Sequence, residues 1–292
     1  MSNSGVILVT FAALFWGLAG GIAGVLINNG WDPLLVSFIR GAIGLLFVLL
    51  WLAVRSRNSG LVYLRLWFWS ILAGLGVAGN FAFYFLSIEK GSVAVAATLM
   101  YCAPVFVYLI SFALRLERPS AVKWASIFLV LVGVVMLTRI YQVDGSALSL
   151  FAVITGLLSG LSLALFIFAF KYAAMQGSPQ AILSIAFTTL VIVLGSTIDL
   201  TEIKRVPGSV DWPLFLILGV LGAGASFILY IIGLRQTPPA LASIAGTLEP
   251  VTAAVFGVAI LSETLVSSQI LGMVIILITV TGLGIYSQRY KS

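Results

Sequence analysis

Histidine is absent from the 292-residue sequence, there is a single cysteine, Cys102, and only 8% of the residues are charged. Without histidine and with one thiol, the chain has no disulfide, no Cys/His metal cluster and no histidine general base. A soluble domain carries about 25% charged residues, which form its water-facing shell. The shortage of charge therefore excludes soluble enzymes, nucleic-acid-binding proteins and disordered proteins.

What the sequence has instead is long apolar runs: 61% of its residues are hydrophobic. The first run, Gly5 to Ile27, is long enough for a helix that crosses a bilayer. Ten such runs predict an all-α membrane protein with a single transmembrane domain, residues 1–292. The spans are expected at 5–28, 33–54, 66–88, 91–114, 120–138, 147–170, 178–199, 213–234, 239–261 and 267–287.

The basic residues between the spans are unevenly distributed, and loops rich in Lys and Arg stay in the cytoplasm. If the N-terminus is cytoplasmic, ten basic residues lie on that side, four lie outside, and Arg40 lies within a span. The cytoplasmic set is Arg55, Arg57, Arg65, Arg115, Arg118, Lys123, Lys171, Arg235, Arg289 and Lys291, and the outer set is Lys90, Arg139, Lys204 and Arg205. An even number of spans then places both termini in the cytoplasm.

The sequence also repeats itself at an offset of 146 residues, half its length. The matching pairs include Phe81 and Phe227, Tyr84 and Tyr230, Gly76 and Gly222, Pro104 and Pro250, and Glu117 and Glu263. Trp16-Gly17 fits Ser159-Gly160 better, at an offset of 143. Each repeat, 5–138 and 147–287, holds five predicted spans, and because five is odd the two repeats have inverted topology, which is typical of transporters.

Prolines lie in the middle of the fourth and ninth spans. Pro104 cannot donate a hydrogen bond to the carbonyl of Met100, nor Pro250 to that of Gly246, so both helices are expected to kink. The freed carbonyls at mid-membrane depth are candidates to accept a substrate ammonium. A kink that only shapes helix packing is the alternative, and the sequence leaves both open.

Glu249 is the one carboxylate deep within a span. Because a charge there costs at least about 2.5 kcal/mol, it is expected to face a watery cavity or a partner. It is interpreted as a proton carrier or a contact for a substrate ammonium, with a protonated structural group as the alternative. Arg40 is expected to reach lipid headgroups or to form a structural pair, and pairing with Glu249 or a substrate carboxylate stays open.

A polar stripe follows one face of the third span, at Asn80, Tyr84 and Ser87. The eighth span repeats it at Ser226, Tyr230 and Gly233. Together with Trp16, Tyr101, Phe166 and Thr247, these residues predict a pocket with aromatic walls and few polar contacts, suited to an amphipathic organic molecule. Packing or an interfacial aromatic belt is the alternative for each aromatic residue alone.

The segment Leu248-Glu249-Pro250-Val251, followed by Leu261-Ser262-Glu263-Thr264-Leu265 and Gly272, resembles the EamA repeat of the drug/metabolite transporter superfamily. A weaker copy surrounds Pro104 and Glu117, and the resemblance spans the whole chain. It is greatest to the aromatic amino acid exporters. The family implies a basket-like bundle of ten helices whose fifth and tenth helices are set aside. The implied cavity residues are Trp16, Asn80, Tyr84, Tyr101, Pro104, Ser159, Leu163, Tyr230, Thr247 and Glu249.

The leading hypothesis is an inner-membrane, alternating-access exporter of amphipathic metabolites such as neutral or aromatic amino acids. The alternative is a proton-coupled multidrug or quaternary-ammonium exporter that uses Glu249. A membrane-embedded enzyme lacks any supporting motif, and a channel would conduct without saturation. No cofactor or metal is expected, and because there is no Walker motif, ATP is not the expected energy source. The expected partners are a small-molecule substrate and the lipid bilayer, without nucleic acid, and the sequence leaves monomer and homodimer open.

Overall fold

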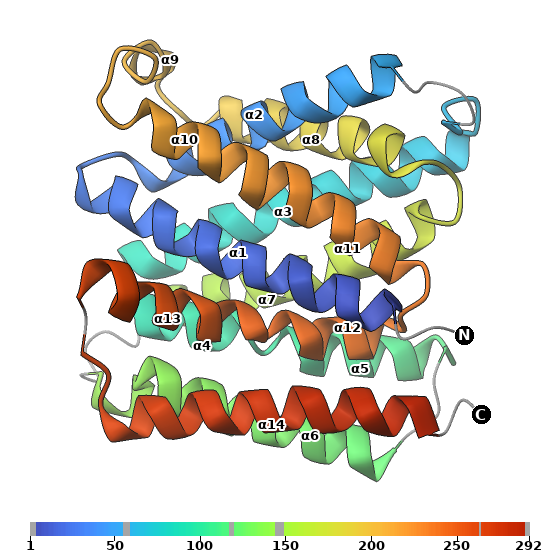
Figure 1. Ribbon diagram of the computed structural model, residues 1–292, viewed down its shortest axis with the longest axis vertical. Coiled ribbons are helices and arrows are strands. Elements are labelled where there is room, and N and C mark those ends of the chain that lie inside the picture. The colour runs from blue at the N-terminus through green and yellow to red at the C-terminus, as the bar shows by residue number, and fades with distance from the viewer. Residues whose placement is uncertain (1–3, 55–58, 117–119, 144–148, 263, 290–292) are drawn as a thin grey trace.

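The computed structural model describes residues 4–54, 59–116, 120–143, 149–262 and 264–289. All regular secondary structure in these ranges is helical, which confirms the expected all-α class (Figure 1). The α-helices are α1 (Ser4–Asn28), α2 (Pro33–Val54), α3 (Leu64–Glu89), α4 (Val93–Met100), α5 (Ala103–Ala113), α6 (Ala121–Thr138), α7 (Leu150–Ala173), α8 (Pro179–Gly195), α9 (Leu200–Ile203), α10 (Trp212–Gly219), α11 (Ser226–Leu234), α12 (Pro239–Gly246), α13 (Leu248–Leu261) and α14 (Ser267–Arg289). A 3₁₀ turn (Ile140–Gln142) follows α6, and a π-helical segment (Val220–Ala225) joins α10 to α11.

The helices form a membrane bundle. Among the described residues, eight helical stretches are long and apolar enough to cross a bilayer, and α8 and most of α14 are shorter apolar helices. Large apolar side chains face outward, including Leu50 at 70% exposure and Phe128 at 67%. Apolar surface of this extent, together with the length of the apolar helices, is suited to contact with the hydrocarbon core of a bilayer. The total of ten spans and the cytoplasmic termini stay predictions.

The two ends of the bundle differ. α1 begins and α14 ends at the same end, which we call the terminal end, and the α1–α2 and α3–α4 connections lie at the other, which we call the mouth end (Figure 1). This arrangement agrees with an even number of crossings.

Two spans are interrupted close to their prolines. The α4–α5 span breaks between Met100 and Ala103, directly before Pro104, and the α12–α13 span breaks at Thr247, before Pro250. A proline removes one helical hydrogen bond and its ring clashes with the preceding turn, so the helix yields on the N-terminal side of each ring.

Helices α6 and α14 lie side by side at one edge of the bundle (Figure 1). They are the fifth and tenth predicted spans, which the family resemblance sets aside. The pair is in close contact because glycines face each other: a methyl group on Gly272 would lie 2.5 Å from the Gly133 carbonyl oxygen. Small residues at such crossings let backbones approach, which drives helix association in a membrane.

We expect Gly272→Ala to lower the free energy of unfolding by about 1–3 kcal/mol, because the added methyl overlaps backbone atoms of α6. Gly282→Ala on the same helix is the matched control, since its methyl would meet nothing within 4 Å. Denaturant unfolding of the purified protein in micelles measures both. Equal stabilities of the two variants would contradict the close α6–α14 contact.

Candidate functional site

A cavity of about 590 Å³ lies within the bundle. Its walls come mainly from α1, α3, α4 and α13, with Arg40 and Ser37 from α2. The lining reaches Asn28 at the end of α1 and Ile88 near the end of α3, so the cavity extends to the mouth end. Small-molecule sites measure roughly 300–1,000 Å³, so the cavity has the size of a metabolite site.

Aromatic side chains close the cavity toward the terminal end. The Trp16 ring centroid lies 4.9 Å from that of Tyr230, 5.1 Å from that of Phe227 and 6.1 Å from that of Phe166. These four side chains, which we call the aromatic plug, are each buried. Within the described part of the chain, neither the Trp16 indole N–H nor the Tyr230 hydroxyl has a hydrogen-bond partner.

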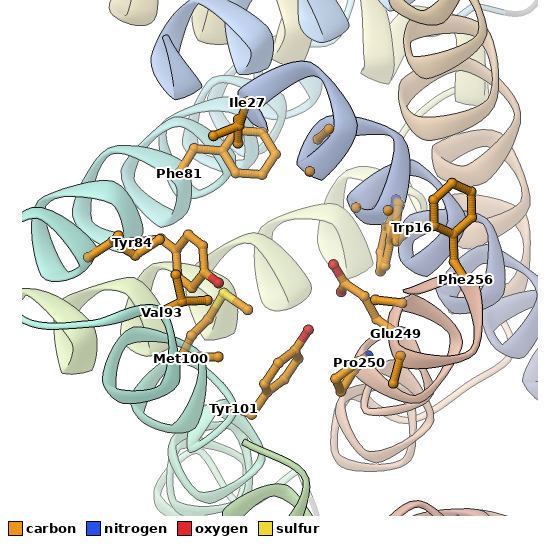
Figure 2. Close-up of a pocket in the computed structure, with 18 of the residues that line it drawn as sticks. Trp16, Ile27, Phe81, Tyr84, Val93, Met100, Tyr101, Glu249, Pro250 and Phe256 are labelled. Atoms are coloured by element: carbon orange, nitrogen blue, oxygen red, sulfur yellow. The ribbon is translucent and has the colours of Figure 1, made fainter. Parts of the chain in front are cut away.

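Three polar side chains point into the cavity from different walls. Figure 2 shows the hydroxyls of Tyr84 on α3 and Tyr101 after α4 directed toward the same space as the carboxylate of Glu249 on α13. No hydrogen bond or ion pair of these three side chains is found among the described residues. Their polar atoms are therefore available to a bound molecule or to water.

Arg40 is the second charged side chain of the described lining. Its Nη2 and Nε donate to the Gly222 carbonyl oxygen at 2.6 and 3.1 Å, and its guanidinium lies 5.4 Å from the centroid of the Phe81 ring. Gly222 belongs to the π-helical segment, where the regular hydrogen-bond ladder is displaced. Arg40 therefore has a structural partner, and among the described residues it forms no salt bridge with Glu249.

Glycines divide α1 into a packed face and an open face. A methyl group on Gly17 would lie 2.4 Å from the Glu249 carbonyl oxygen, so this contact fixes the distance between α1 and the start of α13. Gly20 and Gly24 line the cavity, and a methyl group on either would meet nothing within 4 Å. Gly21, four residues after Gly17, also packs against α13, since its methyl group would lie 2.3 Å from the Phe256 ring, whereas Gly20 and Gly24, with the same spacing, border open space.

Six of the ten predicted substrate-binding residues line this cavity: Trp16, Asn80, Tyr84, Tyr101, Leu163 and Glu249. Pro250, one of the two predicted kink residues, lines it as well. Pro104, Ser159, Tyr230 and Thr247 lie outside the lining. The substrate-binding role of all ten stays a prediction.

The four residues outside the lining have other surroundings. Ser159 Oγ donates to the Asn80 carbonyl at 2.9 Å, Thr247 Oγ1 donates to the carbonyl of Ile244 at 2.6 Å, and Tyr230 packs behind Trp16. Pro104 is buried in the first turn of α5.

The carbonyl that Pro104 leaves without its helical donor, that of Met100, lies against α7. A methyl group on Gly160 would be 3.0 Å from its oxygen. Glu117 and Glu263, the paired glutamates of the repeat, lie outside the described residues.

Sequence reasoning missed several apolar residues of the cavity wall. Phe81 and Phe85 line it from α3 and Phe256 lines it from α13. On α3 a signal existed, because Phe81, Tyr84, Phe85 and Ile88 follow the i, i+3, i+4, i+7 spacing of one helix face.

Known transporters resemble this chain over most of its length. A model of the EamA-like transporter family matches residues 3–139 and again residues 150–285. A relative from Archaeoglobus fulgidus, named an uncharacterized transporter, is 30% identical over 260 residues, which cover 89% of this chain and 90% of the relative. The uncharacterized transporter YwfM of Bacillus subtilis is 23% identical over 277 residues, which cover 93% of this chain and 90% of YwfM. One solved crystal structure matches the whole chain over its own full length, with a TM-score of 0.76 and 17% identity, and so shares its fold.

Asn80 and Ser159 satisfy each other across the α3–α7 contact. Asn80 Nδ2 donates to Ser159 Oγ at 3.0 Å and to the Ser159 carbonyl at 3.1 Å. We expect Ser159→Ala to lower the free energy of unfolding by about 1 kcal/mol, since interhelical hydrogen bonds in membranes contribute about 0.6–1.7 kcal/mol. Unfolding in micelles measures the change.

Ser243→Ala is the control for this substitution. Ser243 is also buried, but its hydroxyl donates to Ala240 within its own helix at 2.8 Å. A Ser159 variant as stable as the Ser243 variant would rule out the structural role of the Asn80–Ser159 pair.

Proposed function

Because the chain belongs to the EamA-like transporter family, in the drug/metabolite transporter superfamily, we propose that it is an alternating-access exporter of small amphipathic metabolites. We further propose that neutral and aromatic amino acids are its substrates. A multi-pass transporter of this family acts on a small molecule in a lipid bilayer and is not, as a rule, an enzyme. The substrate, the direction and the mechanism are our proposal.

One observation carries the choice of substrate. The cavity has aromatic walls and two charged side chains of opposite sign, Glu249 and Arg40, which come from different helices and do not pair directly in the described structure. A zwitterion with an apolar side chain complements such a site, because each of its ends meets the opposite charge. A buried charge in a membrane is costly, so a ligand that brings an opposite charge to each of the two side chains is favoured.

The proposed binding mode follows from these positions. The substrate ring packs on Trp16, Tyr84 or Tyr101, and its ammonium meets Glu249. Arg40 uses two donor atoms for Gly222 and has further N–H groups for a carboxylate. Asn80, which also lines the cavity, adds a polar edge near the middle of α3.

The orientation of the exporter follows from charge. Described basic side chains at the terminal end, such as Arg65, Arg115 and Lys123, favour placing this end in the cytoplasm of a bacterial or archaeal cell. The mouth end then faces outward from the inner, or plasma, membrane, and the cavity is in the state that releases substrate. The single domain 1–292 would rock as two inverted repeats, 5–138 and 147–287.

Counterflow in proteoliposomes tests this function. Vesicles loaded with unlabelled phenylalanine are diluted into trace labelled phenylalanine, and we expect a transient accumulation of label that excess tyrosine or tryptophan blocks. Empty liposomes and liposomes with heat-denatured protein are the controls. No accumulation with any amino acid would reject the proposed substrate class.

Tyr84→Ala should lower the counterflow rate about three- to tenfold, because an aromatic contact contributes about 0.5–1.5 kcal/mol. The matched variant is Phe128→Ala, which removes an aromatic ring that faces lipid on α6 and should leave the rate unchanged. Equal counterflow rates for the two variants would show that Tyr84 does not contribute to substrate binding.

A second candidate function is a proton-coupled exporter of organic cations. It is favoured by the unpaired state of Glu249 and by the engagement of Arg40 with Gly222, which leaves the carboxylate as the main charge facing the cavity. Aromatic walls next to a carboxylate are also the surroundings in which quaternary ammonium ions bind.

The Glu249→Gln variant separates the two functions. If organic cations are the substrate, the variant should lose uptake of a lipophilic cation driven by a pH gradient and should release no proton on binding. If amino acids are the substrate, phenylalanine counterflow should be weakened while lipophilic cations remain unbound in either form. A glutamine variant with full cation uptake would reject the second candidate.

A further inference from the structure

Two elements of the first repeat border the open mouth of the cavity, and Leu261 and Leu265, at the end of α13 and just after it, also line the cavity. Asn28 ends α1 on one side, and Ile88 of α3 and Val93 of α4 lie on the other. All three residues line the cavity. The α3–α4 hairpin and the end of α1 are therefore separated by open space.

The second repeat has counterparts of the same elements at the terminal end. The offset of 146 residues maps Ile88 of the α3–α4 hairpin to Leu234 of the α11–α12 hairpin. The offset of 143, which fits the first helix of the repeat, maps Asn28 to Lys171 in the last turn of α7. The counterpart of the open mouth is thus the junction of α7 with the α11–α12 hairpin.

That junction is closed by two basic side chains. Lys171 Nζ donates to the carbonyls of Leu234 at 2.6 Å, Arg235 at 3.0 Å and Thr237 at 2.9 Å. Arg235 Nε donates in return to the carbonyl of Ala174, at the C-terminus of α7, at 2.7 Å. Two helix C-termini meet here, and a cation neutralises the partial negative charge of each.

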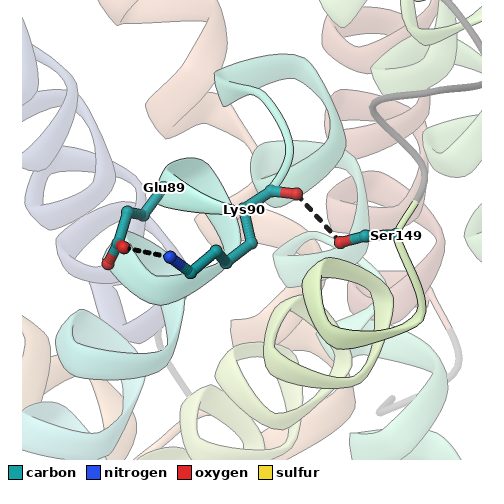
Figure 3. Close-up of polar contacts among 3 residues, drawn as sticks. All are labelled: Glu89, Lys90 and Ser149. Atoms are coloured by element: carbon teal, nitrogen blue, oxygen red, sulfur yellow. Dashed lines mark hydrogen bonds and ion pairs between the residues drawn. The ribbon is translucent and has the colours of Figure 1, made fainter.

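Among the described residues, no side chain closes the open mouth in this way. Figure 3 shows Lys90 Nζ paired with Glu89 of the same hairpin at 2.6 Å, and Ser149 Oγ donating to the Lys90 carbonyl at 2.9 Å. The first contact stays within the hairpin, the second reaches the start of α7, and neither extends to α1. The two repeats thus have equivalent hairpins. The α11–α12 hairpin is bound to α7 by Lys171 and Arg235, whereas the α3–α4 hairpin is separated from α1 by the cavity.

We propose that Lys171 and Arg235 form a latch that closes a second mouth, through which substrate enters the site from the terminal end. This inference rests on the proposed alternating-access function. When the latch opens, Tyr230 lines the new cavity as its counterpart Tyr84 lines the present one, and its buried hydroxyl gains access to water or substrate. The aromatic plug separates the two cavities in the closed state.

Thiol accessibility in the reconstituted full-length protein tests the latch. Cys102→Ser removes the single native thiol, and Ile88→Cys or Leu234→Cys then places one reporter at the open or the closed mouth. A membrane-impermeant maleimide is added from each side, and the rates of modification are compared with and without Lys171→Met. Labelling requires no substrate, so this experiment tests the proposed latch independently of the proposed amino acid specificity.

We expect the thiol at 88 to react readily and the thiol at 234 to be protected while Lys171 is present. Lys171→Met should raise the rate of modification at 234 at least about tenfold from the terminal side, because the charge-assisted hydrogen bonds that close this mouth are lost. The rate at 88 should fall, because in alternating access one mouth closes as the other opens. Lys171→Arg should restore protection. Arg235→Gln is a milder second variant and should act in the same direction.

Lys90→Met is the matched control at the other mouth and should change neither rate, because Lys90 pairs within its own hairpin. Unchanged rates in both latch variants would overturn the proposal. So would a rise at both reporters, which indicates general loosening, or a thiol at 234 that already reacts rapidly beside Lys171.

Discussion

A bilayer imposes one constraint on which this structure depends: a backbone N–H or C=O that leaves the helical ladder needs a partner within the protein. Where the spans are broken or distorted, that partner comes either from the same turn or from a neighbouring helix. Cys102 N–H donates to the Leu99 carbonyl at 3.2 Å at one break, and Arg40 donates to the Gly222 carbonyl in the π-helical segment. Because Tyr101 and Arg40 line the cavity, distorted backbone and the polar wall of the site occur together.

The two charges of the cavity differ in their physical situation. The Arg40 guanidinium donates a hydrogen bond to the Gly222 carbonyl and lies over the Phe81 ring. Glu249 has neither a hydrogen bond nor a salt bridge among the described residues. The carboxylate of Glu249 is therefore the main charge in the cavity that a ligand can neutralise. A zwitterion and an organic cation can both place a positive charge beside Glu249. Only the zwitterion also has a negative group that can bind Arg40. This single difference separates the two proposed substrate classes.

Sequence reasoning predicted the helices well because each apolar run ends at a clear signal. The second span was expected at 33–54 and is Pro33–Val54, and the sixth was expected at 147–170 and is Leu150–Ala173, three residues later at each end. The family resemblance is confirmed by the match of both halves. What the sequence could not provide was the partner of each polar group. Lys171 binds backbone carbonyls, which every residue has, so no side-chain pattern in the sequence predicts this contact. Asn80 binds Ser159, which is far from it in the sequence, and their spacing does not predict the pairing either.

The bare stretch of α1 at Gly20 and Gly24 has a consequence for the evolution of this transporter. Most positions in a packed bundle resist enlargement, because any added atom displaces a neighbour. At Gly20 and Gly24 an added methyl group would meet nothing within 4 Å, so alanine at either position narrows the cavity while the helix contacts stay as they are. The volume open to a substrate can therefore be changed at these two positions without a compensating substitution in the neighbouring helices.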